Sequence, residues 1–352
     1  MLRPNFFPVR RRINEISPGT REAVRIRPRI RWEEEGVAST VGTIMALMVF
    51  LAFLSMFTSQ YVPVWMEENE ASHMNEAYGQ FAAMKQAVDM QILAGTIQGT
   101  STVQMFSPIK LGAEGIPMFA SPTPGYLTLS RSASYDNVSF SFNTSASIVD
   151  YNMNTGGTIK LKAENRYYIQ QELAFENDAI ILKQPDGQYM KAMPQLRITP
   201  TGTVTATGGI VCQLSYTQVD LRGDDANYIG FGTRGVSTLM KSTTTTTFTN
   251  LTGESAPGVP ATHPYLSIVH TGYYERAWNS SLNQTLSSAG LRWGFDITNA
   301  NTDYTIVSTL KSPPGSIEKM WEVRVLIKTD VISSFSLTVA NIEISTSELG
   351  AA

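Results

Sequence analysis

The first strong pattern along the chain is an apolar run near the N-terminus that holds no charged residue. It lies between Glu35 and Glu67 and reads VASTVGTIMALMVFLAFLSMFTSQYVPVWM. A membrane-spanning helix needs about 20 predominantly apolar residues, so the run predicts a transmembrane helix over residues 37–64. The apolar core of a secretory signal peptide is about 7 to 15 residues and ends at a small-x-small site. This run is longer and no such site follows it, so we expect the segment to stay in the product.

The helical pattern continues beyond the apolar run. A heptad seam with spacings of 4 and 3, containing one lysine, is formed by Met74, Tyr78, Phe81, Lys85, Val88 and Ile92. We expect one helix from about Thr40 to Ala94, bent near Pro63 and stopped by Gly95, with its amphipathic part over residues 65–95. The seam needs a cover, which is either the protein's own strands or a helix of a neighbouring copy.

From Thr96 onward the apolar positions mostly alternate, which is typical of strands. The runs DAIILK and QYMKAM predict a hairpin around the turn Pro185–Asp186–Gly187. The runs WEVRVLIK and SFSLTVANIEIS predict two late strands, the second with a bulge where its alternation changes phase near Ala340 and Asn341.

Two further segments depart from plain alternation. ERAWNSSLNQTLSSAG places Trp278, Leu282, Leu286 and Ala289 on one helical face, with Gly290 as its end. The low-complexity run Thr243–Thr247 predicts an exposed loop or an edge strand. Together the patterns predict an α+β protein: a long N-terminal transmembrane and amphipathic helix, then a β-rich, sandwich-like ectodomain over residues 96–352. That domain forms one large unit or two lobes with a boundary near residues 200–225.

Charge is distributed unevenly and gives the segment a direction. The first 35 residues hold nine arginines and five glutamates, a formal charge of +4, whereas the whole 352-residue chain is at -3. Arginines before the span and Glu67, Glu68 and Glu70 after it indicate a cytoplasmic leader over residues 1–36 and an extracellular C-terminal domain by the positive-inside rule. Tyr61 and Trp65 fit the outer aromatic belt.

Composition excludes several function classes. The mildly acidic total argues against a nucleic-acid partner. The single cysteine, Cys212, permits no intrachain disulfide and no CxxC metal site. Charged residues make up 16% of the chain, below the roughly 25% usual for soluble globular proteins, as expected for a membrane-anchored, strand-rich chain.

Motifs that could carry chemistry are weak. They comprise the histidines His73, His263 and His270, the GxGxxG glycines Gly230, Gly232 and Gly235, the RGD tripeptide at Arg222, Gly223 and Asp224, and the acidic pair Asp224 and Asp225. The glycine motif is followed by threonine-rich sequence, whereas dinucleotide binding requires a helix there. We therefore expect no catalytic, cofactor-binding or metal-binding residues and a non-enzymatic protein.

Five Asn-x-Ser/Thr triplets outside the span are candidate glycosylation sites if they are exposed. Their asparagines are Asn137, Asn143, Asn250, Asn279 and Asn283.

The run EEEGVASTVGTIMALMVFLAFL resembles the N-terminus of archaeal type IV pilins and archaellin-like proteins. The resemblance implies cleavage after Gly36 by a prepilin-type peptidase, with Val37 as the mature start. It also implies an apolar helix that rests in the membrane or packs in a filament core. The family usually has a basic residue before the glycine, where this chain has Glu33–Glu35.

A stripe of small residues, Ala38, Gly42 and Ala46, is spaced by four and allows close helix packing. Later stretches, among them IKLGAEGIPMFASPTPGYLTL, resemble large archaeal surface proteins that share this N-terminus.

The functional expectation is a type IV pilin-like protein of the cell surface, anchored in the membrane and a candidate filament subunit or homo-oligomer through its N-terminal helix. The alternative is an uncleaved single-pass signal-anchor protein whose ectodomain binds a ligand or partner. An ectoenzyme is the third class.

Overall fold

A computed structural model of the chain describes residues 32–98, 103–131, 137–143, 148–151, 156–249, 251, 265–316 and 318–348. In these ranges one long helix, α1, precedes sixteen strands, a shorter helix, α2, and a single 3-10 turn, η1, at Thr329–Val331. The expected α+β class, a long apolar helix followed by a β-rich domain, is confirmed.

Helix α1 spans Trp32–Gln98 and passes through Pro63. It therefore begins and ends beyond the expected limits of Thr40 and Ala94. A boundary between two compact units falls between Met56 and Phe57, so the helix contributes to both.

The expectation that Gly95 stops α1 is wrong, because the helix continues to Gln98. A Cβ atom at Gly95 would overlap the end of the Met240 side chain and touch Thr243, both on strand β12. The glycine allows the helix to lie close to this strand, which is a packing role and not a termination signal.

The strands form three sheets. The central sheet has the order β1 (Met105–Lys110), β12 (Thr233–Thr249), β16 (Ile332–Glu348), β10 (Ile210–Gly223) and β9 (Leu196–Val204). The six-stranded sheet has the order β11 (Ala226–Gly230), β2 (Gly125–Arg131), β5 (Gly157–Ala163), β6 (Gln171–Glu176), β7 (Ala179–Gln184) and β8 (Gly187–Ala192). The third sheet has the order β14 (Tyr304–Leu310), β15 (Trp321–Lys328), β13 (Tyr265–Gly272), β3 (Asn137–Asn143) and β4 (Ile148–Tyr151). Neighbouring strands are antiparallel except β10 and β16, which are parallel.

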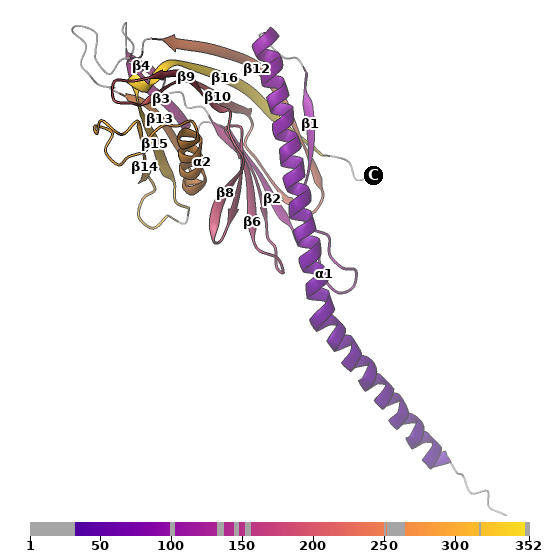
Figure 1. Cartoon of the computed structure of the whole chain (residues 1–352). Helices are drawn as coiled ribbons and strands as arrows, with labels where there is room; N and C mark the ends of the chain where they lie inside the picture. The colour runs from indigo at the N-terminus through magenta and orange to yellow at the C-terminus, as the bar shows by residue number, and fades with distance from the viewer. Residues whose placement is uncertain are drawn as a thin grey trace, which may run out of the picture. The chain divides into compact units, whose positions relative to one another are not determined.

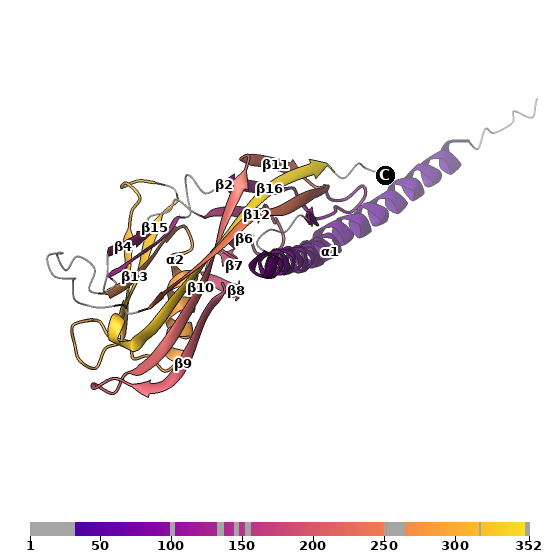
Figure 2. The same ribbon diagram turned by 90° about the horizontal axis from the view of Figure 1, so that it is seen from above.

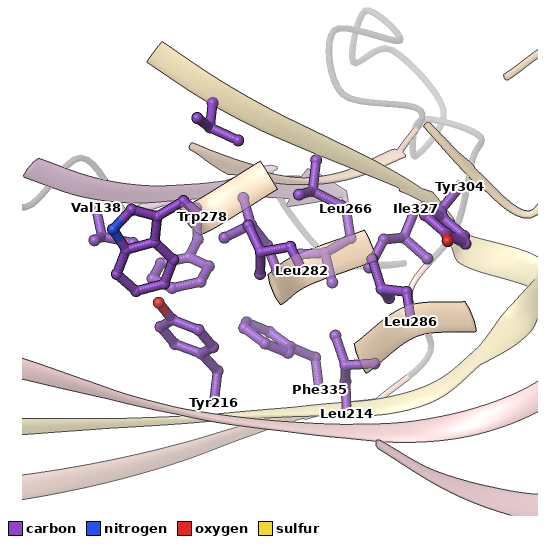
Figure 3. Close-up of a cluster of buried hydrophobic side chains, with 14 of the residues drawn as sticks. Val138, Leu214, Tyr216, Leu266, Trp278, Leu282, Leu286, Tyr304, Ile327 and Phe335 are labelled. Carbon is purple, nitrogen blue, oxygen red and sulfur yellow. The ribbon is translucent and has the colours of Figure 1, made fainter. Parts of the chain in front are cut away.

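Two hydrophobic cores lie on opposite faces of the central sheet. The first core joins the central and third sheets and one face of β6 and β7 with α2 (Glu275–Ser288). The second core joins the central and six-stranded sheets with α1. In Figure 2 the long strands β12 and β16 run from the side of β2 to the side of β15. In Figure 3, Leu214, Tyr216 and Phe335 of the central sheet face Trp278, Leu282 and Leu286 of α2.

Strand β16 contributes to both cores, which explains its change of phase. Its buried residues Phe335, Leu337 and Val339 belong to the first core, and Ala340, Ile342 and Ile344 belong to the second. Alternate residues of a strand point to opposite faces, so β16 buries one face in its first half and the other face in its second half.

The bulge expected near Ala340 and Asn341 lies on the neighbouring strand instead. The register between β12 and β16 shifts between Met240 and Ser242, opposite Ile342 and Asn341. The change of phase in β16 was therefore a change of covered face. The boundary expected near residues 200–225 stays a prediction; β10, within that range, contributes to both cores.

Other local expectations are confirmed. Strands β7 and β8 pair as a hairpin closed by Gln184 and Gly187. Helix α2 buries Trp278, Leu282 and Leu286 and is followed by Gly290 at φ +90. The threonine run is part of a strand: its residues pair with β16, and β1 pairs with β12 only over Thr233–Thr238.

Candidate functional site

The candidate functional site is α1, which consists of an exposed apolar half and a half packed on strands. Among the described residues it is the one helix long and apolar enough to cross a membrane, and no part of its most apolar 18-residue window is buried. Met45, Met48 and Phe53 are 64%, 64% and 66% exposed. An exposed helix face of this size is typical of a lipid or protein contact.

The second half of α1 is covered by the chain's own strands, one of the two covers that the sequence left open. The buried seam consists of Met74, Ala77, Phe81, Met84, Val88 and Ile92, all in the second core. The predicted seam was therefore slightly rotated: Tyr78 is 38% exposed, and Lys85 makes ion pairs at the edge of the seam.

A buried carboxylate, Glu70, ties α1 to two loops of the β-domain. Its side chain accepts hydrogen bonds from the Thr123 hydroxyl at 2.7 Å and from the backbone N–H groups of Arg166, Tyr167 and Tyr168 at 3.0, 2.8 and 2.7 Å. The residue has no exposed surface. Buried charges are stable in proteins only when they are paired or hydrogen-bonded, and here four donors surround one carboxylate. We call this arrangement the Glu70 clamp.

The electrostatics of the clamp favour the ionised carboxylate. Burial by itself raises the pKa of Glu70, but the hydrogen bonds from Arg166, Thr123, Tyr168 and Tyr167 outweigh it and hold the pKa below its ordinary value. The clamp is therefore charged at neutral pH.

A second polar contact joins α1 to the buried turn between β6 and β7. Lys85 Nζ lies 2.8 Å from Asp178 Oδ2 and 3.2 Å from Asp89 Oδ2, and the Gln195 amide donates to Asp89 Oδ1 at 2.7 Å. Burial raises the pKa of Asp178 to about 8, although Lys85 opposes the shift. One lysine thus lies beside two carboxyl groups, and the buried one, Asp178, holds its proton at neutral pH.

The turn that holds Asp178 also reaches the first core. Asn177 and Asp178 have φ values of 44° and 63°, the left-handed conformation that a tight hairpin turn requires and that Asn and Asp tolerate. Asn177 Oδ1 accepts the N–H of Val219 at 2.9 Å. The preceding residue, Glu176, lies 2.8 Å from the Trp278 indole nitrogen and 2.8 Å from His270 Nε2. Three consecutive polar side chains therefore connect α1, the central sheet and α2.

Local sequence reasoning missed both polar centres. Glu70 was used only as a charge that sets orientation, and Asp178 was read as the start of a strand. The lysine within the apolar seam was the one available signal, because a lysine there needs a carboxylate partner. The sequence does not say which carboxylate supplies it.

The residues expected to direct processing, Gly36 and Val37, are part of α1. The helix begins at Trp32, so Gly36 and Val37 fall within its first two turns and cleavage between them requires this end to open. The stripe Ala38, Gly42 and Ala46 also lies on α1; Gly42 and Ala46 are exposed, and nothing lies within 4 Å of a Cβ built on Gly42.

The candidate glycosylation sites differ in access. Asn283 is exposed, Asn279 is half-buried with its amide donating to Ser308 Oγ, and Asn143 is buried at 1% exposure. The burial of Asn143 argues against its glycosylation in the folded chain. Asn137 is at the start of β3, and Asn250 lies outside the described residues.

The weak chemical motifs lie apart from one another. His73, on α1, donates from its ring nitrogen Nε2 to the Lys110 carbonyl at 3.0 Å. His270 is beside Glu176, and His263 lies outside the described residues. Gly230 ends β11 and β12 begins at Thr233, so no helix follows the GxGxxG motif. Arg222 and Gly223 end β10, and Asp224 and Asp225 connect it to β11. Over the described ranges no group of three or more His, Cys, Asp and Glu side chains is arranged to hold a metal ion.

A groove of about 560 Å³ lies between α1 and the outer strands of the six-stranded sheet. Its lining includes Tyr78, Tyr168 and Tyr189 together with Lys191 and several amide side chains, and holds no carboxylate. This volume is within the range of small-molecule sites.

Comparison of the chain with models of protein families, with curated proteins and with solved structures found no match.

Proposed function

We propose that this chain is a non-enzymatic, type IV pilin-like protein of the cell surface, archaeal in type, with α1 as its membrane anchor and candidate polymerisation element. The observation that carries the proposal is the division of α1. Its first half is apolar, exposed and free of charge between Glu35 and Glu67, and its second half is built into a β-domain. The N-terminus is cytoplasmic and the sandwich-like β-domain is extracellular in this proposal.

The helix suits either membrane anchoring or packing in a filament. An exposed apolar face needs a cover of lipid or protein, and the small residues Ala38, Gly42 and Ala46 allow neighbouring helices to approach. A chain that polymerises through α1 would exchange lipid for identical helices, while the Glu70 clamp keeps the β-domain fixed to the second half of the helix.

N-terminal sequencing or intact-mass measurement of the native protein tests the proposal. A product that starts at Val37 supports processing by a prepilin-type peptidase, and retention of Met1 refutes pilin-type processing. A Gly36→Val variant should accumulate uncut. Gly42→Val, at the sixth residue of the mature chain, is the matched control and should be cut normally. Sheared surface fractions viewed by electron microscopy should contain the chain in filaments if it polymerises.

The tyrosine-lined groove favours one second candidate, an uncleaved signal-anchor protein whose ectodomain binds a ligand. Aromatic rings and amide groups in one groove can bind a ligand with apolar faces and hydroxyl groups. Retention of Met1, together with ligand binding that Tyr189→Ala weakens, would support this candidate over the pilin-like one.

A further inference from the structure

The loop between β1 and β2 carries an exposed apolar tip. We call residues 114–120 the wedge loop; its sequence is EGIPMFA. Met118 is 100% exposed and Phe119 is 42% exposed. Contiguous exposed apolar patches mark protein or membrane contacts, so the neighbours of this pair decide its meaning.

The wedge loop has a defined conformation. The Ile116 carbonyl accepts the N–H groups of Phe119 and Ala120 at 3.0 and 2.9 Å, and Met118 has a φ of +68°. A Cβ on Gly115 would overlap the Ala120 carbonyl oxygen. A non-glycine residue with positive φ is uncommon and persists where the surrounding structure holds it. The tip is therefore presented by its turn.

The base of the loop is fixed to α1. Ala113 and Thr123 exchange two backbone hydrogen bonds of 3.0 Å across the base, and Thr123 is one of the donors of the Glu70 clamp. The Asn69 amide also donates to the Glu114 carbonyl at 3.4 Å. In Figure 1 the loop that follows β1 lies beside α1.

The tip packs against the aromatic side chains of α1. The Phe119 ring lies 5.2 Å from Phe57, which in turn lies 5.8 Å from Tyr61 and 5.5 Å from Trp65. Tyr61 and Trp65 are 49% and 43% exposed. Tyrosine and tryptophan are enriched where a membrane meets water, so this cluster has the composition of an interfacial belt.

The position of the cluster along α1 decides what covers it. Phe57 precedes Trp65 by eight residues, or about 12 Å of helix at 1.5 Å per residue, and belongs to the stretch without charge that ends at Glu67. A bilayer that surrounds this stretch with Trp65 at its surface also reaches the level of Phe57, and hence of Phe119.

We propose that the wedge loop inserts Met118 and Phe119 into the outer interface of the bilayer and is a second membrane contact of the β-domain beside α1. The inference rests on the proposed function only in taking α1 as membrane-spanning. With two contacts, the β-domain is held in one orientation on the membrane surface instead of turning freely about the helix.

The test uses the full chain in nanodiscs that hold a single copy, with a fluorophore on Met118→Cys and spin-labelled lipids as quenchers. Leu51→Cys reports the span, and Phe295→Cys, on an apolar side chain that is 89% exposed, is the matched control. Wild type controls the labelling, because its single cysteine, Cys212, is buried. Lipid-borne quenchers distinguish contact with lipid from contact with a second copy.

Loss of fluorescence at Met118→Cys and Leu51→Cys, with none at Phe295→Cys, is the expected result. Quenching at Leu51→Cys alone overturns the membrane insertion of the wedge loop but still supports α1 as the membrane span. Absence of quenching at both sites overturns the span as well. Equal quenching at Phe295→Cys shows general adsorption of the domain and also overturns the proposal.

Discussion

The Glu70 clamp offers the sharpest test of how α1 is held, through the substitution Glu70→Gln. The glutamine can turn its amide oxygen to the N–H groups of Tyr167 and Tyr168 and its nitrogen to the Thr123 hydroxyl, so the shape of the site is kept and the charge is lost. Hydrogen bonds to charged groups contribute roughly 1.5–3 kcal/mol and neutral ones about 1 kcal/mol. For four donors we expect the free energy of unfolding to fall by about 2–4 kcal/mol, since such contributions are not additive.

The assay is denaturant unfolding of the full chain in mild detergent, followed by tryptophan fluorescence, with Glu68→Gln as the control. Glu68 is exposed on the same helix, and surface changes of this kind usually alter stability by less than about 0.5 kcal/mol. The comparison therefore separates the effect of the buried carboxylate on stability from the effect of removing one negative charge from the helix.

The pH dependence of unfolding gives a second readout for the same variant. The pKa of Glu70 is lowered from its ordinary value of 4.5 in the folded chain. Its contribution to stability is therefore fully present above that value and is lost as the pH falls through the lowered pKa. The free energy of unfolding should therefore fall less steeply with decreasing pH in Glu70→Gln than in Glu68→Gln. Equal stability of the two variants at neutral pH, together with an equal loss of stability at acid pH, would refute a stabilising role of the clamp.

Two further predictions concern the packing of α1. The pKa of Asp178 is raised to about 8 from its ordinary 3.8, so its contribution to stability is full below pH 3.8 and is lost as the pH rises to about 8. In Asp178→Asn the free energy of unfolding should therefore change less between these two pH values than in wild type. An unchanged slope would contradict this prediction. Gly95→Ala should destabilise the fold by up to about 1 kcal/mol, because the new methyl group overlaps the end of the buried Met240 side chain, and moving that flexible side chain offsets the helix propensity gained. Gly79→Ala, where nothing lies within 4 Å of the added Cβ, should instead stabilise the helix by up to about 1 kcal/mol. Thermal unfolding compares the two variants directly. Shifts of Tm with the same sign in both would contradict the close approach of α1 to β12.

Elements defined by local periodicity were predicted well. Residues close together in the sequence are enough to predict three of them: the hairpin of β7 and β8, the strand β15, and helix α2 with its terminal Gly290. The same holds for the apolar half of α1, since a run of apolar residues without charge is visible in any window of the sequence.

Predictions that depend on a distant neighbour were less accurate. Gly95 looked like a helix end, but Met240, far along the chain, makes it a packing position. The change of phase in β16 looked like a bulge because one covered face was assumed for the whole strand. Periodicity shows that a residue is buried, but not which other segment buries it.

By itself the sequence determined the apolar helix, the succession of strands and the asymmetry of charge, because each depends on residues that are near one another in the chain. Only the tertiary structure decided that Glu70 holds two loops, that Lys85 meets Asp178, and that the wedge loop lies against Phe57. Each of these contacts joins residues more than 50 positions apart. Their partners are chosen by how the sheets stack on the helix, which no local pattern encodes.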